Sequence, residues 1–257
     1  MKASTLRGKV SGLLTKTAAV LFWLILWQIG SMALGQSLLL PSPLAVLARM
    51  VILSQKYAFW HAIGFSFGKI ALGFLSATIA GLLLAVAASR FTAVRILLSP
   101  VMEAVKASPV ASFIILLLLW IPSRNLSIAI SFLMVVPIIY TNLCAGITAT
   151  DIRMRELAEV FKTGPLRRLR YLYLYQVMPY FRSACAVSLG LCWKSGIAAE
   201  VIGLPRGSIG EQLYQAKIYL DIPDLFAWTI VVVLMSMLFG RLFLRLLDTL
   251  VQQLERM

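Results

Sequence analysis

The sequence predicts an all-α polytopic membrane protein with about six transmembrane helices and both termini in the cytoplasm. Hydrophobic residues make up 60% of the 257 residues and charged residues only 13%. Roughly 25% of a typical soluble domain is charged. The apolar residues form repeated runs of roughly 20, the length that a helix needs to cross the hydrocarbon core. Together these observations indicate one transmembrane domain over residues 1–257.

Six apolar runs are interpreted as the spans. Their limits are drawn at charged residues and prolines, which gives 17–34, 61–88, 97–121, 127–147, 181–202 and 225–243. A short helix is expected to begin after Pro43, because proline suits the first turn of a helix. Small residues recur at helical spacing in the second span and would let another helix approach closely in lipid. They are Gly64, Gly68, Gly73, Ser76, Ala77 and Gly81.

The distribution of lysine and arginine sets the orientation. Sixteen of these residues lie in the N-terminal tail, the turn at 89–96, the region 151–182 and the end from Arg241, whereas five lie in segments assigned to the other side. Because cytoplasmic loops carry an excess of lysine and arginine, both termini and the 151–182 region are placed on the cytoplasmic side of a cell membrane. The net charge of +14 is therefore attributed to topology and anionic lipid headgroups. Nucleic acid is not expected as a partner.

Motifs for chemistry are missing from the sequence. It has no G-x-x-x-x-G-K-[ST] phosphate loop, no G-x-S-x-G elbow and no H-E-x-x-H pair. It has one histidine, His61, and three cysteines in apolar surroundings, a pattern unlike a metal site or a disulfide framework. The chain is therefore not expected to be an enzyme or to hold a cofactor or metal. Any energy source other than an ion gradient must come from a partner.

The segment 151–179 stands out because it carries nine of the 34 charged side chains, which are 24 basic and 10 acidic. Asp151 is expected to cap a helix whose apolar residues recur at i, i+3, i+4 and i+7. Those residues are Met154, Leu157, Ala158 and Phe161, with Glu156, Glu159 and Lys162 off that face. Gly164 and Pro165 then separate this helix from a second, arginine-rich one. The pattern alone allows the apolar face to pack on its own chain or lipid, or to dock on a cytoplasmic partner.

This segment also resembles the EAA loop of permease subunits of ATP-binding-cassette importers. Glu156 and Ala158 match that motif, Leu157 replaces its middle alanine, and Lys162 and Tyr175 occupy its glycine and proline positions. Three other stretches resemble the nitrate/sulfonate/taurine branch of these permeases. They are Leu40–Pro43, Ser108–Ile121 and Trp193–Glu200. The resemblance covers most of the chain and implies the fold of a type I importer permease.

The resemblance implies that Glu156 to Gly164 form a coupling helix that docks on a separate ATPase subunit. The residues assigned to docking are Met154, Glu156, Leu157, Ala158, Glu159, Phe161, Lys162 and Gly164. The implied partners are the ATPase, an extracytoplasmic solute-binding protein, a second permease copy and membrane lipid. The implied solute is small and is either nitrate/sulfonate/taurine-like or like a thiamine precursor.

Two charged residues of the fifth span, Lys194 and Glu200, are candidates for the solute pathway, because ionisable side chains in spans usually face protein or a water-filled cavity. They are six residues apart, about 240° around a helix, so they are not expected to share a face. A structural role for either remains open. An ion-coupled secondary transporter that uses Lys69, Lys194 and Glu200 is an alternative, although no inverted repeat is visible. A non-transporting membrane scaffold is another.

Overall fold

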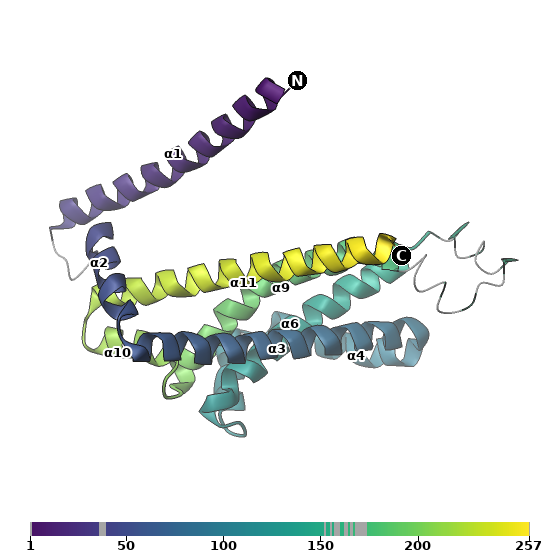
Figure 1. Ribbon diagram of the computed structural model, residues 1–257. Coiled ribbons are helices and arrows are strands. Elements are labelled where there is room, and N and C mark those ends of the chain that lie inside the picture. The colour runs from purple at the N-terminus through teal and green to yellow at the C-terminus, as the bar shows by residue number, and fades with distance from the viewer. Residues whose placement is uncertain are drawn as a thin grey trace. The chain divides into compact units, whose positions relative to one another are not determined.

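The computed structural model describes residues 2–35, 40–151, 153–154, 156, 160–161, 164, 167 and 174–256. Helices account for the secondary structure of these residues, and no strand occurs among them (Figure 1). The helices are α1 (Lys2–Leu34), α2 (Pro43–Ser54), α3 (Tyr57–Arg90), α4 (Thr92–Ala107), α5 (Val110–Leu117), α6 (Ser123–Thr148), α9 (Leu174–Gly203), α10 (Ile209–Ile218) and α11 (Ile222–Arg256). The predicted all-α class is confirmed.

The chain forms two units. One comprises residues 1–60 and 212–231, and the other comprises residues 61–211 and 232–257. Helices α3, α10 and α11 each continue from one unit into the other. The first unit therefore contains α1 and α2, and the second contains α4, α5, α6 and α9.

Five helices are long and apolar enough to cross a membrane. They are Thr17–Leu34 within α1, Tyr57–Arg90, Ser123–Thr148, Tyr175–Gly203 and Ile222–Gln253. Helices α4 and α5 meet the same criterion only as a pair, and they bend by 104° where they meet. The described part of the chain thus supplies five spans, or six if the bent pair crosses as one, in agreement with the predicted number.

The segment 97–121 was predicted as one helix, and the structure divides it at Ser108 and Pro109. The backbone of Ser108 is extended, with φ −82° and ψ 141°. The ring of a proline disfavours helical geometry in the preceding residue, which explains the interruption. Hydropathy indicates apolar character here but does not report the direction of the helix axis.

The five membrane-length helices extend beyond the predicted span limits, and α1, α9 and α11 do so by seven or more residues at one end. Helix α1 begins at Lys2 and α11 continues to Arg256, so both include polar segments that were predicted to lie outside the spans. Helix α9 begins at Leu174, so residues 174–179 of the predicted coupling region belong to a long helix. Charged residues mark where a helix leaves the hydrocarbon, whereas the helix itself continues until a cap or proline ends it.

In the first unit, the Leu40–Pro43 segment is fixed by side chains of α1. The indole Nε1 of Trp27 donates to the Pro41 carbonyl at 3.0 Å, and the Ser31 hydroxyl donates to the Leu40 carbonyl at 2.8 Å. Ser42 then caps α2, because its hydroxyl accepts a hydrogen bond from the backbone N–H of Ala45 at 3.2 Å. The short helix predicted to begin after Pro43 is present, and it begins at Pro43 itself.

In the second unit, α3 and α6 approach closely at two glycines. A Cβ on Gly73 would lie 2.7 Å from the Ile128 carbonyl oxygen, and one on Gly81 would lie 2.9 Å from the Ile139 side chain. Only part of the small-residue series serves this contact, because a Cβ at Gly64 or Gly68 would meet nothing within 4 Å. Close backbone approach of this kind replaces the hydrophobic driving force that is missing in lipid.

Helices α9 and α11 are joined by a bidentate ion pair in the second unit. The guanidinium of Arg182 donates to both carboxylate oxygens of Asp248, at 2.6 and 3.0 Å. Aromatic rings pack in the same unit, with Phe239 in edge-to-face contact with Phe67 and Phe74.

Candidate coupling segment and transport path

The start of the predicted coupling segment is held by Asp151. Its Oδ1 accepts a hydrogen bond from the backbone N–H of Arg153 at 2.9 Å, as expected of a capping aspartate. Its own N–H donates to the Oε1 of Gln176 at 3.1 Å, which connects this point to the first turn of α9. The segment therefore begins at a fixed position beside α9.

Four of the eight predicted docking residues belong to the described part of the chain. Met154, Glu156 and Phe161 are exposed, and the apolar ring of Phe161 is 70% accessible. A Cβ on Gly164 would meet nothing within 4 Å. The other four, Leu157, Ala158, Glu159 and Lys162, lie outside the described residues. Exposed apolar side chains in this segment are available to a partner.

Glu200, one of the two charged residues predicted in the fifth span, is fully buried near the end of α9. Its Oε2 accepts hydrogen bonds from the Ser66 hydroxyl at 2.6 Å and from the backbone N–H of Gly210 at 3.3 Å. The Ser66 hydroxyl in turn accepts from the backbone N–H of Ile209 at 2.9 Å. Ile209 and Gly210 open α10, so Glu200 and Ser66 together bind the free N–H groups at the positive end of that helix.

The contact between α10 and α9 depends on a glycine. A Cβ on Gly210 would lie 2.3 Å from the Cβ of Glu200 and 2.4 Å from its carbonyl carbon. Oε1 of Glu200 and the hydroxyl of Ser127 are buried and have no hydrogen-bond partner among the described residues. Glu200 thus fixes α10 through one oxygen only.

Lys194 occupies a different environment from Glu200, as their spacing predicted. It is the one exposed residue in the stretch from 192 to 197 of α9, whose other members are buried. In the described part of the chain no carboxylate forms an ion pair with it. Gly190 lies one turn before Lys194, and a Cβ there would meet nothing within 4 Å. Lys194 therefore lies on an open face of α9, and the residue one turn before it, Gly190, has no side chain.

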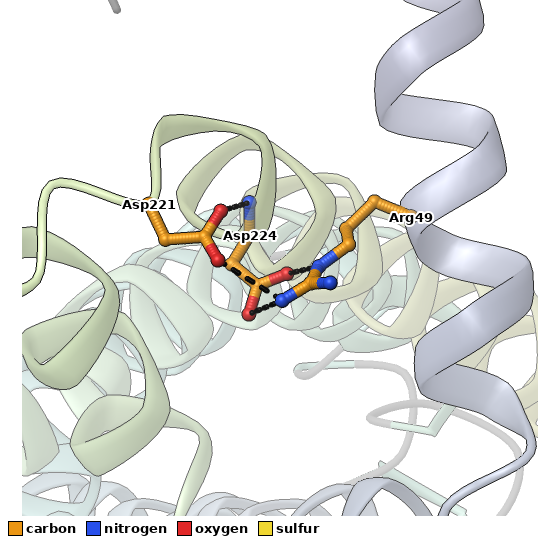
Figure 2. A network of polar contacts seen from close by, with 3 residues as sticks. All are labelled: Arg49, Asp221 and Asp224. Atoms are coloured by element: carbon orange, nitrogen blue, oxygen red, sulfur yellow. Dashed lines mark hydrogen bonds and ion pairs between the residues drawn. The ribbon is translucent and has the colours of Figure 1, made fainter.

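A second polar cluster was not predicted from the sequence, and it lies in the first unit (Figure 2). Arg49 of α2 donates through Nε to Oδ1 of Asp224, and through Nη2 to Oδ2 of Asp224 at 3.1 Å and to Oδ2 of Asp221 at 2.9 Å. The hydrogen bond to Asp224 is the main reason why the pKa of the Arg49 guanidinium is raised above its ordinary value. One cation thus binds two carboxylates that are 172 and 175 residues away in the sequence.

The two carboxylates also organise the junction between α10 and α11. Asp221 precedes α11 and accepts the backbone N–H of Asp224 at 3.2 Å, which is a helix N-cap. Leu220 just before it has a φ of 54°, in the left-handed region where a side chain is strained. Its strained conformation ends α10, with Asp221 N–H donating to the Ala216 carbonyl at 2.9 Å.

Comparison with known proteins assigns this architecture to a family. Residues 77–256, more than two thirds of the chain, match the family described as the binding-protein-dependent transport system inner membrane component. A permease protein assigned to aliphatic sulfonate transport in Bacillus subtilis (strain 168) is 24% identical over 97% of this chain and 86% of its own length. The taurine transport system permease protein of Escherichia coli (strain K12) is 24% identical over 74% of this chain and 71% of its own. The bicarbonate transport system permease protein of Synechococcus elongatus is 26% identical over 82% of this chain and 79% of its own length.

A solved structure has the same fold. It is described as the crystal structure of an amino acid ABC transporter with histidines, and it matches with a TM-score of 0.55 at 17% identity. The match covers 73% of this chain and 90% of that one. The family match, the relatives and the apolar helices agree with the resemblance found in the sequence. The chain therefore belongs to the binding-protein-dependent transport system inner membrane component family and is a permease subunit of an ATP-binding-cassette importer.

Proposed function

We propose that two copies of this chain form the membrane pathway of an importer that a separate ATPase drives and an extracytoplasmic binding protein supplies. Family membership supports this assembly, since the name of the family itself specifies binding-protein-dependent transport. It also makes an ion-coupled transporter or an inert scaffold the less favoured alternatives. The residues from Thr17 to Leu34 of α1 are not buried by the rest of the chain, which suits contact with lipid.

The coupling segment is proposed to dock on the ATPase. It begins at the capped Asp151 and presents Met154 and Phe161 to the outside. An apolar helix face beside the membrane is suited to a groove on a soluble partner. The hydrogen bond from Asp151 N–H to Gln176 gives a route by which movement of this segment reaches α9.

Lys194 is proposed to line the solute path, and Glu200 is proposed to hold α10 in place. The observation that carries this assignment is the exposure of Lys194 in the middle of an otherwise buried stretch of a membrane-length helix. An ammonium group in hydrocarbon costs several kcal/mol, so such residues face water-filled cavities or bind anionic groups. In a two-copy assembly, the open face around Gly190 and Lys194 is proposed to face the pathway.

A small solute with an acidic group is the preferred cargo. Relatives at comparable identity are named for taurine, aliphatic sulfonates, bicarbonate and nitrate, all of which carry an anionic group at neutral pH. A relative named for formylaminopyrimidine is 25% identical over 88% of this chain, so a neutral solute is the competing class. Lys194 has no ion-pair partner among the described residues, and this favours the anionic class.

The experiment is uptake into proteoliposomes that contain the permease, its ATPase and its binding protein. Taurine, an alkanesulfonate, nitrate, bicarbonate and formylaminopyrimidine are offered separately. We expect Lys194→Gln to lower uptake of the anionic solute about tenfold, corresponding to a loss of about 1.4 kcal/mol of binding or barrier energy. Lys194→Arg, which keeps the charge, should retain most of the uptake.

The matched control is Lys217→Gln, which removes an exposed lysine from α10. Normal uptake by Lys194→Gln would remove Lys194 from the path. Uptake of formylaminopyrimidine alone by the unmodified protein would overturn the anionic class while leaving the importer assignment intact.

A further inference from the structure

An open pocket of about 510 Å³, most of whose lining residues are exposed, lies between α4 and α6 in the second unit, at the end where α4 begins and α6 ends. Six of its lining residues carry polar atoms or sulfur. They are Arg95, Ser99, Tyr140, Thr141, Cys144 and Thr148. Its volume falls in the range typical of small-ligand sites. None of the site residues discussed above lines it, and we name it the α4–α6 pocket.

The residues that line this pocket carry one positive charge and no negative charge. Arg95 contributes its cation, no carboxylate lines the pocket, and within the described ranges no acidic residue forms an ion pair with Arg95. Arg95 also lies in the first turn of α4, where Phe91 provides no side-chain cap and no acidic residue is present. A cation near the positive end of a helix is unfavourable by itself, and an anion bound beside it would offset both charges.

Three of the four hydroxyl groups of the pocket already donate to acceptors of the protein, and the fourth, that of Tyr140, interacts with the side chain of Cys144. The Thr141 hydroxyl donates to the Pro137 carbonyl at 2.7 Å, and the Thr148 hydroxyl donates to the Cys144 carbonyl at 2.8 Å. The Ser99 hydroxyl donates to Oε1 of Glu103 at 3.2 Å, a contact long enough to exchange for a closer acceptor. The guanidinium of Arg95 is left as the principal donor. Its planar fork matches two oxygens of a tetrahedral oxyanion.

We propose that the α4–α6 pocket binds an oxyanion group, namely a sulfonate, sulfate or phosphate, through Arg95. This inference goes beyond the proposed function, since neither Lys194 nor the described docking residues line the pocket. The group can come from a water-soluble anion or from the headgroup of an anionic phospholipid. Thr148 lies three residues before Asp151, so a ligand here contacts the helix that leads directly into the coupling segment.

Cys144 is a native reporter of occupancy. It lines the pocket and is partly accessible, whereas Cys185 and Cys192 are buried. The full-length permease in phosphatidylcholine nanodiscs is treated with anionic 2-sulfonatoethyl methanethiosulfonate, and Cys144→Ser identifies the labelled residue. We expect millimolar sodium sulfate to slow labelling about fivefold relative to sodium chloride of equal ionic strength, since equal ionic strength equalises screening.

The variants test whether Arg95 carries this protection. Arg95→Gln should abolish it, and Arg90→Gln should preserve it, because Arg90 is an exposed arginine at the end of α3 that does not line the pocket. Protection that is equal in Arg95→Gln and the unmodified protein, or no protection by sulfate or by anionic lipid, would overturn the proposal.

A second arm distinguishes the source of the oxyanion. Nanodiscs in which phosphatidylglycerol replaces part of the phosphatidylcholine are labelled without sulfate. Slower labelling that depends on Arg95 in these discs, without an effect of sulfate, identifies the lipid headgroup. Protection by sulfate in phosphatidylcholine identifies the soluble anion.

A third measurement applies if Arg95→Gln does not remain monodisperse. The unmodified protein is then labelled with cationic 2-(trimethylammonio)ethyl methanethiosulfonate as well. Each rate of reaction with Cys144 is divided by the rate of the same reagent with a free thiol. At low salt, this normalised rate should be about fivefold higher for the anionic reagent than for the cationic one, because a positive cleft concentrates anions. A preference for the cationic reagent would contradict the proposal.

Discussion

The Ser66 hydroxyl donates to the Glu200 carboxylate at 2.6 Å across 134 residues of sequence, and the same hydroxyl accepts the Ile209 N–H. Ser66→Ala should therefore lower the free energy of unfolding by about 2–3 kcal/mol, since it leaves a buried carboxylate and a backbone donor short of partners. Thermal unfolding in detergent measures the loss. Ser76→Ala is the control, because the Ser76 hydroxyl donates to the Gly73 carbonyl of its own helix at 3.0 Å and has no other partner in the described ranges. Equal stability of Ser66→Ala and Ser76→Ala would refute this account of the cluster.

Gly210→Ala should destabilise the protein by about 1–3 kcal/mol, because the added methyl group meets the backbone of Glu200 and not a movable side-chain end. Gly240→Ala in α11 meets nothing within 4 Å and should not destabilise the protein. The comparison uses the melting temperatures of the two variants. A stable Gly210→Ala would mean that α10 does not pack against α9 at this distance.

Arg49→Gln should weaken the junction of α2 with α10 and α11 by about 1–2 kcal/mol, because two carboxylates lose their shared partner. Since the Arg49 side chain is 32% exposed, the loss should shrink as sodium chloride is raised from about 0.05 to about 1 M. Arg206→Gln removes an exposed arginine that has no ion pair among the described residues and serves as control. A loss that does not change with salt would argue against an electrostatic clamp.

Leu220→Gly should raise the free energy of unfolding by about 0.5–1 kcal/mol, because glycine adopts the left-handed conformation without strain. Leu220 is 65% exposed, so little packing is lost. Leu220→Ala keeps the strained backbone and should stay close to the unmodified protein in the same melting experiment. Destabilisation by glycine alone would show that the leucine side chain contributes contacts that outweigh its strain.

The coupling proposal is tested by pull-down of the ATPase. Glu156→Lys, or deletion of residues 156–164, should abolish ATPase binding and transport while membrane insertion stays normal. Gln252→Lys introduces a lysine at an exposed position of α11, outside the coupling segment, and is the control. ATPase binding and uptake at normal levels in Glu156→Lys would remove the segment from the interface.

Local sequence signals predicted local structure well. Proline predicted a short helix beginning after Pro43, and α2 begins at Pro43. Asp151 was correctly expected to act as a helix cap. The helical angle between Lys194 and Glu200 correctly separated their surroundings. Hydropathy located the spans, but it carries no information on axis direction and so missed the break after Ser108.

Contacts between residues far apart in the sequence could not be predicted from it, for a physical reason. Ser66 and Arg49 look like ordinary polar residues of a helix, and their roles arise only when Glu200 or Asp221 and Asp224 are brought to them. Gly210 gave no signal either, since its need for a missing Cβ depends on how close α9 lies. The small-residue series in α3 was recognised, yet only packing shows that Gly73 and Gly81 are contacted and Gly64 and Gly68 are not.

The bend of 104° between α4 and α5 makes this membrane segment two levers that share a pivot at Ser108 and Pro109. The lever formed by α4 borders the α4–α6 pocket, and the lever formed by α5 carries Ile114 into a buried cluster with Leu126 and Ala199. Because proline donates no N–H, turning about the pivot does not require a hydrogen bond at Pro109 to break. Rotation of one lever can thus displace the other while both remain helical.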